Sequence, residues 1–120
     1  MAYEILVVDD DADMLRMLSL VLNEEGYQVR LARDGDEAIR AAEEQAPDLV
    51  LLDLLLPVEP GLTVAERLKS GVCSDVPIIA MSASDPMIAR VRAEACFEGW
   101  LPKPFSFQTL LHYVSMAGDA

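Results

Sequence analysis

The stretch EILVVDDD, residues 4–11, is an apolar run that ends in three carboxylates. Its hydrophobic residues are continuous rather than alternating, which is typical of a strand buried on both faces of a parallel sheet. Adjacent like charges repel, so Asp9, Asp10 and Asp11 need compensating positive charge or dipoles nearby. The stretch therefore predicts a buried strand that delivers acids to the loop behind it.

Four further apolar runs predict strands, and helical patterns separate the five. The runs at 48–52 and 76–81 are nearly as continuous as the first, whereas the run at 27–32 alternates as an edge strand does. The predicted strands are 4–8, 27–32, 48–52, 76–81 and 99–102. The predicted helices are 12–25, 36–45, 61–70, 85–96 and 106–116. This alternation indicates an α/β domain with a parallel sheet, right-handed crossovers and helices on both faces, although periodicity does not give the strand order.

Helix-end signals accompany this pattern. Asp11 stands directly before the first helix and is predicted to be its N-cap, and Gly26 is predicted to end that helix. Ser84 or Asp85 is predicted to cap the fourth helix, with Pro86 in its first turn.

Composition narrows the possible functions. The 120 residues suit one domain, and the net charge of −12 argues against direct nucleic-acid binding. Cys73 and Cys96 are far apart in the sequence and are expected to be free thiols in a reducing cytoplasm. The chain has no apolar run of about 20 residues and no basic leader, so we expect neither a membrane span nor a signal peptide.

Polar groups of complementary type follow four predicted strands. Asp9 and Asp10 follow the first, Asp53 the third, Ser82 the fourth and Lys103 the fifth. Ligands of open parallel sheets bind beyond the carboxyl ends of the strands, where these groups should meet. The carboxylates would repel one another, and one lysine does not neutralise them. An all-oxygen site with few protein ligands favours Mg²⁺.

The acids could also suggest an EF-hand loop that starts at Asp9. Such a loop needs Gly at its sixth position and Glu at its twelfth, where this chain has Met14 and Leu20. We therefore reject the EF-hand. A carboxylate, a divalent cation, a lysine and a hydroxyl together suit phosphoryl transfer, with the carboxylate as nucleophile.

Four motifs in order resemble the receiver domain of two-component response regulators. They are VVDDD, then DLVLLDLLLP with Gly61 four residues after Pro57, then PIIAMSA and WLPKPF. The resemblance covers the whole chain, residues 1–120. It implies a doubly wound, flavodoxin-like three-layer sandwich with strand order 2-1-3-4-5.

The resemblance also implies the roles of the site residues. Asp53 would accept a phosphoryl group from the phosphohistidine of a histidine kinase or a histidine phosphotransfer protein. Mg²⁺ would be held by Asp10, Asp53 and the backbone carbonyl of Leu55, with Asp9 acting through water. The domain would assist its own phosphorylation and dephosphorylation without being an enzyme.

The remaining implied roles concern the phosphoryl group and the switch. Lys103, with a cis bond to Pro104, Ser82 and the backbone amide of Ala83 would contact the phosphoryl oxygens. Ser82 would then move inward and Trp100 would rotate, changing the surface of the fourth helix, fifth strand and fifth helix. That surface would meet a downstream protein or output domain, or form a phosphorylation-dependent homodimer.

The chain departs from the family at several places. Trp100 stands where Tyr or Phe is usual, Cys96 and Phe97 stand where Gly-Ala is common, and Pro60 replaces a common Asp or Asn.

Three alternative functions remain. An aspartyl-phosphate phosphatase would need an acid at Leu55, and a flavin-phosphate site would not place three aspartates behind the first strand. An unphosphorylated docking domain would usually lack one of the acids or the lysine.

Overall fold

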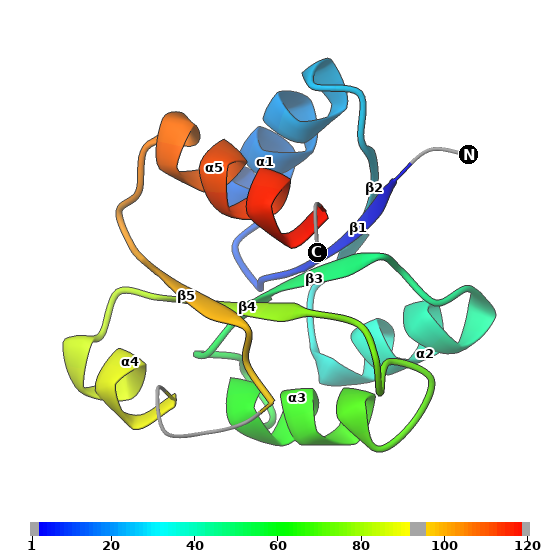
Figure 1. Cartoon of the computed structure of the whole chain (residues 1–120). Helices are drawn as coiled ribbons and strands as arrows, with labels where there is room; N and C mark the ends of the chain where they lie inside the picture. Colours follow the sequence, from blue (N-terminus) through cyan, green and yellow to red (C-terminus); the bar gives the residue numbers. More distant parts are fainter. Residues whose placement is uncertain (1–2, 92–95, 119–120) are drawn as a thin grey trace.

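The computed structural model describes residues 3–91 and 96–118 of the chain. Within them, strands and helices alternate along the chain (Figure 1). The strands are β1 (Glu4–Val8), β2 (Gln28–Ala32), β3 (Leu49–Asp53), β4 (Ile78–Ser82) and β5 (Gly99–Pro102). The helices are α1 (Ala12–Glu24), α2 (Gly35–Glu44), α3 (Gly61–Lys69), α4 (Asp85–Val91) and α5 (Phe107–Gly118).

The strands form one parallel sheet in the order β2-β1-β3-β4-β5. Helices α1 and α5 cover one face, and α2, α3 and α4 cover the other (Figure 1). This confirms the doubly wound three-layer α/β fold and its strand order. The order reverses between β1 and β3, which is where such sheets form their ligand sites.

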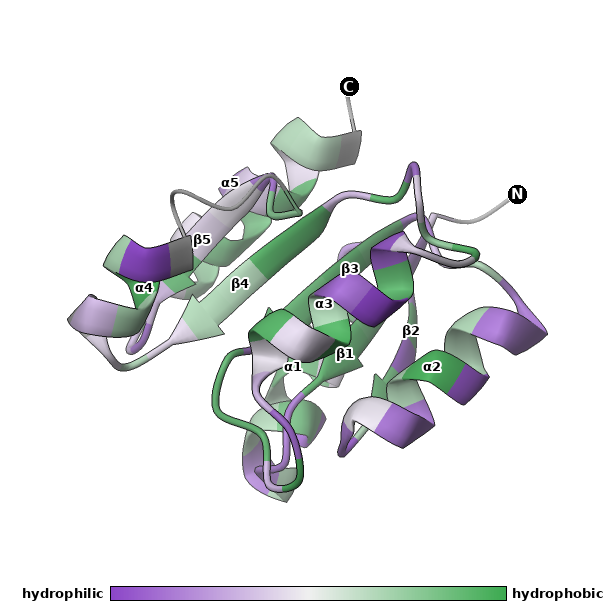
Figure 2. Ribbon diagram, turned by 90° about the horizontal axis from the view of Figure 1, so that it is seen from below, coloured by the Kyte–Doolittle hydropathy of each residue, from purple (hydrophilic) through white to green (hydrophobic). Residues whose placement is uncertain are grey.

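The core has two halves, one on each face of the sheet, because successive strand side chains point to opposite faces. In β1, Leu6 and Val8 pack under α2 and α3, whereas Ile5 and Val7 pack under α1 and α5. Apolar residues accordingly fill the central strands, while polar residues lie on the outer sides of the helices (Figure 2). The continuous hydrophobic runs of β1, β3 and β4 follow from burial on both faces.

Strand β2 lies at the edge of the sheet, as its alternating pattern predicts. Its Arg30 donates from Nε to Oε1 of the buried Glu4, at 2.8 Å, and from Nη1 to the carbonyl of Ala41, at 2.6 Å. One arginine thus neutralises a buried acid and caps the last turn of α2. This cluster lies at the end of the sheet opposite the candidate site.

The caps are where the sequence predicts them, and the boundaries differ by one or two residues. Asp11 accepts from the amides of Asp13 and Met14 as the N-cap of α1, and Gly26 ends that helix with φ of 93°. Ser84 caps α4 by accepting from the amide of Met87 at 3.4 Å.

The ends of four elements show how the structure departs from the sequence prediction. Helix α2 begins one residue earlier than predicted because Asp34 caps it. The predicted fourth helix runs to Cys96, but Cys96 lies in a turn, and 92–95 fall outside the described residues. Asp53 and Ser82 are the last residues of β3 and β4 rather than the first residues of the loops.

Cys73 is a free thiol in the core, as predicted, and Cys96 is partly buried. In the described part of the chain, the helices are too short or too polar to cross a bilayer.

Candidate functional site

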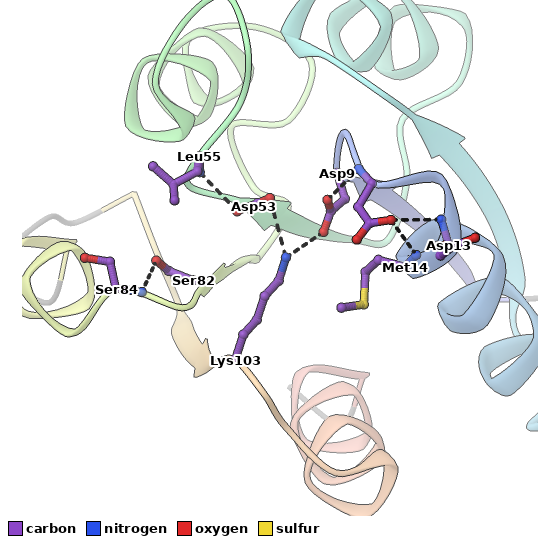
Figure 3. Close-up of polar contacts among 9 residues, drawn as sticks. Asp9, Asp13, Met14, Asp53, Leu55, Ser82, Ser84 and Lys103 are labelled. Carbon is purple, nitrogen blue, oxygen red and sulfur yellow. Dashed lines mark hydrogen bonds and ion pairs between the residues drawn. The ribbon is translucent and has the colours of Figure 1, made fainter.

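The carboxyl ends of the parallel strands gather the predicted polar residues at one edge of the sheet. Asp9 follows β1, Asp53 ends β3, Ser82 ends β4 and Lys103 follows β5. Figure 3 shows the Lys103 side chain extending between Asp9 and Asp53, with Ser82 on the neighbouring strand. Residues distant in sequence are therefore brought together at the edge where ligands of this fold bind.

Lys103 is the cation of this cluster. Its Nζ lies 2.8 Å from Oδ2 of Asp9 and 3.5 Å from Oδ2 of Asp53. Its own amide donates to the carbonyl of Ser82 at 2.7 Å, which fixes the loop after β5 against the end of β4. The peptide bond between Lys103 and Pro104 is cis, as predicted. No local sequence pattern indicates the direct pairing of Asp9 with Lys103.

The two buried carboxylates are also held by backbone amides. Oδ1 of Asp9 accepts from the amide of Asp11, and Oδ1 of Asp53 accepts from the amide of Leu55, each at 3.0 Å. Because each acid is fixed through one oxygen, its Oδ2 is directed toward Lys103. The orientation of both carboxylates is therefore set before any ligand arrives.

The environment shifts the protonation of Asp53 and Lys103. Burial, together with the charge of Asp9, raises the pKa of Asp53 to about 6, although the Leu55 amide and Lys103 oppose the shift. Burial lowers the pKa of Lys103. The hydrogen bond to Asp9 and the negative charges of Asp9 and Asp53 have a larger opposite effect, so the pKa of Lys103 is raised overall. Lys103 is therefore charged at neutral pH, whereas Asp53 is an unusually basic carboxylate.

The donor set fits a divalent cation. One oxygen from each of Asp9, Asp10 and Asp53 can lie within 4.8 Å of the others. Asp10 is exposed whereas the other two are buried, so the cluster opens to solvent on one side. One ammonium leaves two of the three charges uncompensated when all the carboxylates are ionised. Hard oxygen ligands with open positions favour Mg²⁺ over softer metals.

Ser82 and its neighbours lie beside this cluster. The Ser82 side chain is buried, and its Oγ accepts from the amide of Ser84 at 3.0 Å. Ala83 follows at the exposed start of the β4–α4 loop. Trp100, opposite Ala80 in β5, is partly buried against the core beneath α2, α3 and α4. The hydroxyl and the aromatic residue thus come from adjacent strands.

A further ion pair holds the loop that follows Asp53. Glu59, in the loop between β3 and α3, contacts the guanidinium of Arg67 in α3. No periodic pattern marks this pair. The one sequence feature that draws attention to this loop is the run Glu59-Pro60-Gly61 before α3.

Comparison with known proteins identifies the fold and the family. A family model for the response regulator receiver domain matches residues 5–115. The response regulator MprA of Mycolicibacterium vanbaalenii is 40% identical over 112 residues, which cover 92% of this chain and 48% of that protein. MprA of Mycobacterium tuberculosis is 39% identical over the same length.

Solved structures agree. The chemotaxis response regulator CheY4 of Vibrio cholerae superposes with a TM-score of 0.90 at 28% identity, covering 98% of this chain and 99% of that one. NtrX from Brucella abortus superposes with a TM-score of 0.88 at 31% identity, covering 98% of this chain and 27% of that one.

The chain spans about half the length of the curated relatives it matches. The family model nevertheless covers nearly all of it, including the whole acidic site and every strand except Glu4 at the start of β1. The chain therefore belongs to the response regulator receiver domains of two-component signalling.

Proposed function

We propose that this domain accepts a phosphoryl group on Asp53 from a phosphohistidine of a histidine kinase or histidine phosphotransfer protein. The observation that carries the proposal is Lys103, whose ammonium lies against both Asp9 and Asp53 at the ends of their strands. In the step, a carboxylate oxygen of Asp53 bonds to phosphorus while the phosphorus–nitrogen bond breaks. The electron pair of that bond stays on the imidazole of the partner.

The residues around Asp53 have complementary roles in this proposal. Asp10, Asp53 and the backbone carbonyl of Leu55 would hold Mg²⁺, with Asp9 acting through water. The cation would neutralise negative charge on the transferring group. Lys103 already opposes the charge of both acids and is suited to pair with a phosphoryl oxygen. The raised pKa of Asp53, about 6, still leaves the nucleophile ionised at neutral pH.

The proposed readout starts at Ser82. Its hydroxyl and the backbone amide of Ala83 would bond phosphoryl oxygens, and the inward movement of Ser82 would leave room for Trp100 to rotate. The α4–β5–α5 surface would change as a result. We propose that it acts on a downstream protein or output domain, or on a second phosphorylated copy.

The proposal treats residues 1–120 as one phosphoacceptor domain rather than an enzyme acting on external substrates. Leu55 supports this, because aspartyl-phosphate phosphatases place an acid at that position. Retention of the acids and Lys103 disfavours an unphosphorylated docking role. The net charge of −12 disfavours nucleic-acid binding, and the free thiol of Cys73 suits a cytoplasmic location.

The decisive experiment is an intact-mass measurement after treatment with a phosphorylated histidine kinase and Mg²⁺. We expect one phosphoryl adduct on the parent protein and none on Asp53→Asn. Asp75→Asn is the matched control, because Asp75 is exposed and precedes β4 at the opposite edge of the sheet. An adduct retained by Asp53→Asn, or absent from both the parent and the control, would contradict the proposal.

A further inference from the structure

The loop that joins Asp53 to α3 has little backbone anchoring of its own. Leu55 at its start donates to Asp53, and Gly61 at its end donates to the carbonyl of Leu54 at 2.9 Å. Within the described residues, positions 56–59 form no main-chain hydrogen bond to the fold. Leu55 and Val58 point outward, with 55% and 85% of their surface exposed. Other contacts must therefore hold the loop in place.

The Glu59 side chain provides such a contact. Its Oε1 accepts a hydrogen bond from Nη1 of Arg67, and its side chain is only 22% exposed. The same Nη1 lies 3.4 Å from Oδ1 of Asp36, whose side chain is 73% exposed. One guanidinium thus connects the loop to α3, which carries Arg67, and to the first turn of α2.

Gly35 provides the space for this contact. A Cβ atom at Gly35 would lie 2.5 Å from Oε1 of Glu59 and 2.7 Å from Cγ2 of Val64. Gly35 is not among the residues with positive φ, so its backbone does not require glycine. The absence of a side chain at Gly35 therefore lets the loop carboxylate pack directly on the first turn of α2.

The local charges make Arg67 necessary for that packing. Asp34, Asp36 and Glu37 surround the first turn of α2. The nearby Arg33 pairs with Glu37, since Nη2 of Arg33 lies 3.9 Å from Oε2 of Glu37. Without Arg67, the carboxylate of Glu59 would face Asp36 and would be repelled from its position. The two residues form a loop latch, a name used here for Glu59 paired with Arg67.

We propose that the loop latch positions the β3–α3 loop so that the backbone of Leu55 is ready to bind Mg²⁺. This inference rests on the proposed function, in which the Leu55 carbonyl is a ligand. Leu55 lies four residues from Glu59, so the latch restrains the unbonded part of the loop that follows the ligand. A restrained loop loses less conformational freedom when the ion binds, which raises affinity without a direct contact. Glu59 and Arg67 are therefore positioning residues.

The test measures Mg²⁺ binding by calorimetry for the parent, Glu59→Ala, Arg67→Ala and the control Asp36→Asn. Outer partners of metal ligands typically change affinity by about 10- to 100-fold, and for this partly exposed pair we expect roughly three- to tenfold weakening. Asp36→Asn alters the same guanidinium contact without touching the loop, so its affinity should stay within about twofold of the parent.

The direction of the Arg67→Ala effect separates the latch from simple electrostatics. Loss of a positive charge near an acidic site would by itself strengthen Mg²⁺ binding. The latch predicts weaker binding for both Arg67→Ala and Glu59→Ala, although these variants change the net charge in opposite directions. Arg67→Lys should recover most of the affinity, since an ammonium can still pair with Glu59.

A second readout needs no metal. In EDTA, hydrogen exchange at the amides of Leu55 and Gly61, which donate to Asp53 and Leu54, should accelerate by about threefold or more in both alanine variants. Exchange in the central strands should not change, which shows that the fold is intact.

The outcomes distinguish the latch from the proposed function. Unchanged or tighter Mg²⁺ binding by Arg67→Ala overturns the latch alone, as does unchanged loop exchange. If Arg67→Ala does not fold, Glu59→Ala and Arg67→Gln make the same test. Failure of the parent to bind Mg²⁺ overturns the metal site of the proposed function itself.

Discussion

Replacement of Asp53 by asparagine should stabilise the metal-free protein at neutral pH. The acid is buried beside Asp9, and its pKa is raised from 3.8 to about 6. Each pKa unit corresponds to about 1.4 kcal/mol, so the ionised carboxylate costs at most about 3 kcal/mol of folding free energy. Asparagine removes this cost, keeps an oxygen to accept from the Leu55 amide, and leaves Lys103 paired with Asp9 at 2.8 Å.

The sign of the pH dependence follows from the direction of the shift. Between pH 3.8 and about 6, folded Asp53 binds a proton that the unfolded chain has lost. The stability of the parent therefore falls as pH rises through this window, and the full cost remains above it. The gap is the free energy of unfolding of Asp53→Asn minus that of the parent. It should grow from near zero at about pH 4 to about 2–3 kcal/mol above pH 6.5.

Urea unfolding in EDTA, followed by the fluorescence of Trp100, measures this gap at several pH values. The corresponding rise in melting temperature is roughly 4 °C per kcal/mol for a domain of this size. Asp75→Asn should show no gap at any pH, because that acid is exposed. A variant that is no more stable than the parent at neutral pH, or a gap independent of pH, would refute the reasoning.

Three further predictions follow from other contacts. Gly61→Ala should cost about 1–3 kcal/mol, because its Cβ would lie 2.6 Å from the carbonyl oxygen of Asp53, while Gly71→Ala, with contacts of 3.7 Å and beyond, should be nearly neutral in urea unfolding. Equal costs for the two glycines would contradict this explanation. Arg30→Met should cost about 2–4 kcal/mol by leaving Glu4 buried without its partner, yet leave Mg²⁺ affinity unchanged in calorimetry. A loss below about 1 kcal/mol would show that Glu4 is not destabilised. Finally, Mg²⁺ should compete with the proton of Asp53, so its apparent affinity should fall by up to about tenfold per pH unit below about pH 6. An affinity that stays flat between about pH 5 and 7 would argue against Asp53 as a ligand.

Local sequence was sufficient to predict the secondary structure and several of its ends. The continuous runs of β1, β3 and β4 predicted strands buried on both faces, and both core halves confirm this. Asp11 and Ser84 cap their helices because a short polar side chain before an amphipathic run can bond the free amides of the first turn. The boundary errors occurred where hydrophobic periodicity gives no information. At Asp34, for example, the cap is a hydrogen bond that its side chain accepts from the amide of Glu37.

The sequence by itself also determined which chemical groups are available: a set of carboxylates, a lysine and a hydroxyl, each placed at the end of a strand. Tertiary structure alone decided how they pair. Asp9 and Lys103 are 94 residues apart, and their contact exists because the strand order places β1, β3 and β4 side by side with β5 beyond them. Periodicity reports whether a side chain is buried but not which distant strand lies next to it, so this contact, the raised pKa of Asp53 and the pairing of Glu59 with Arg67 emerge only in the folded chain.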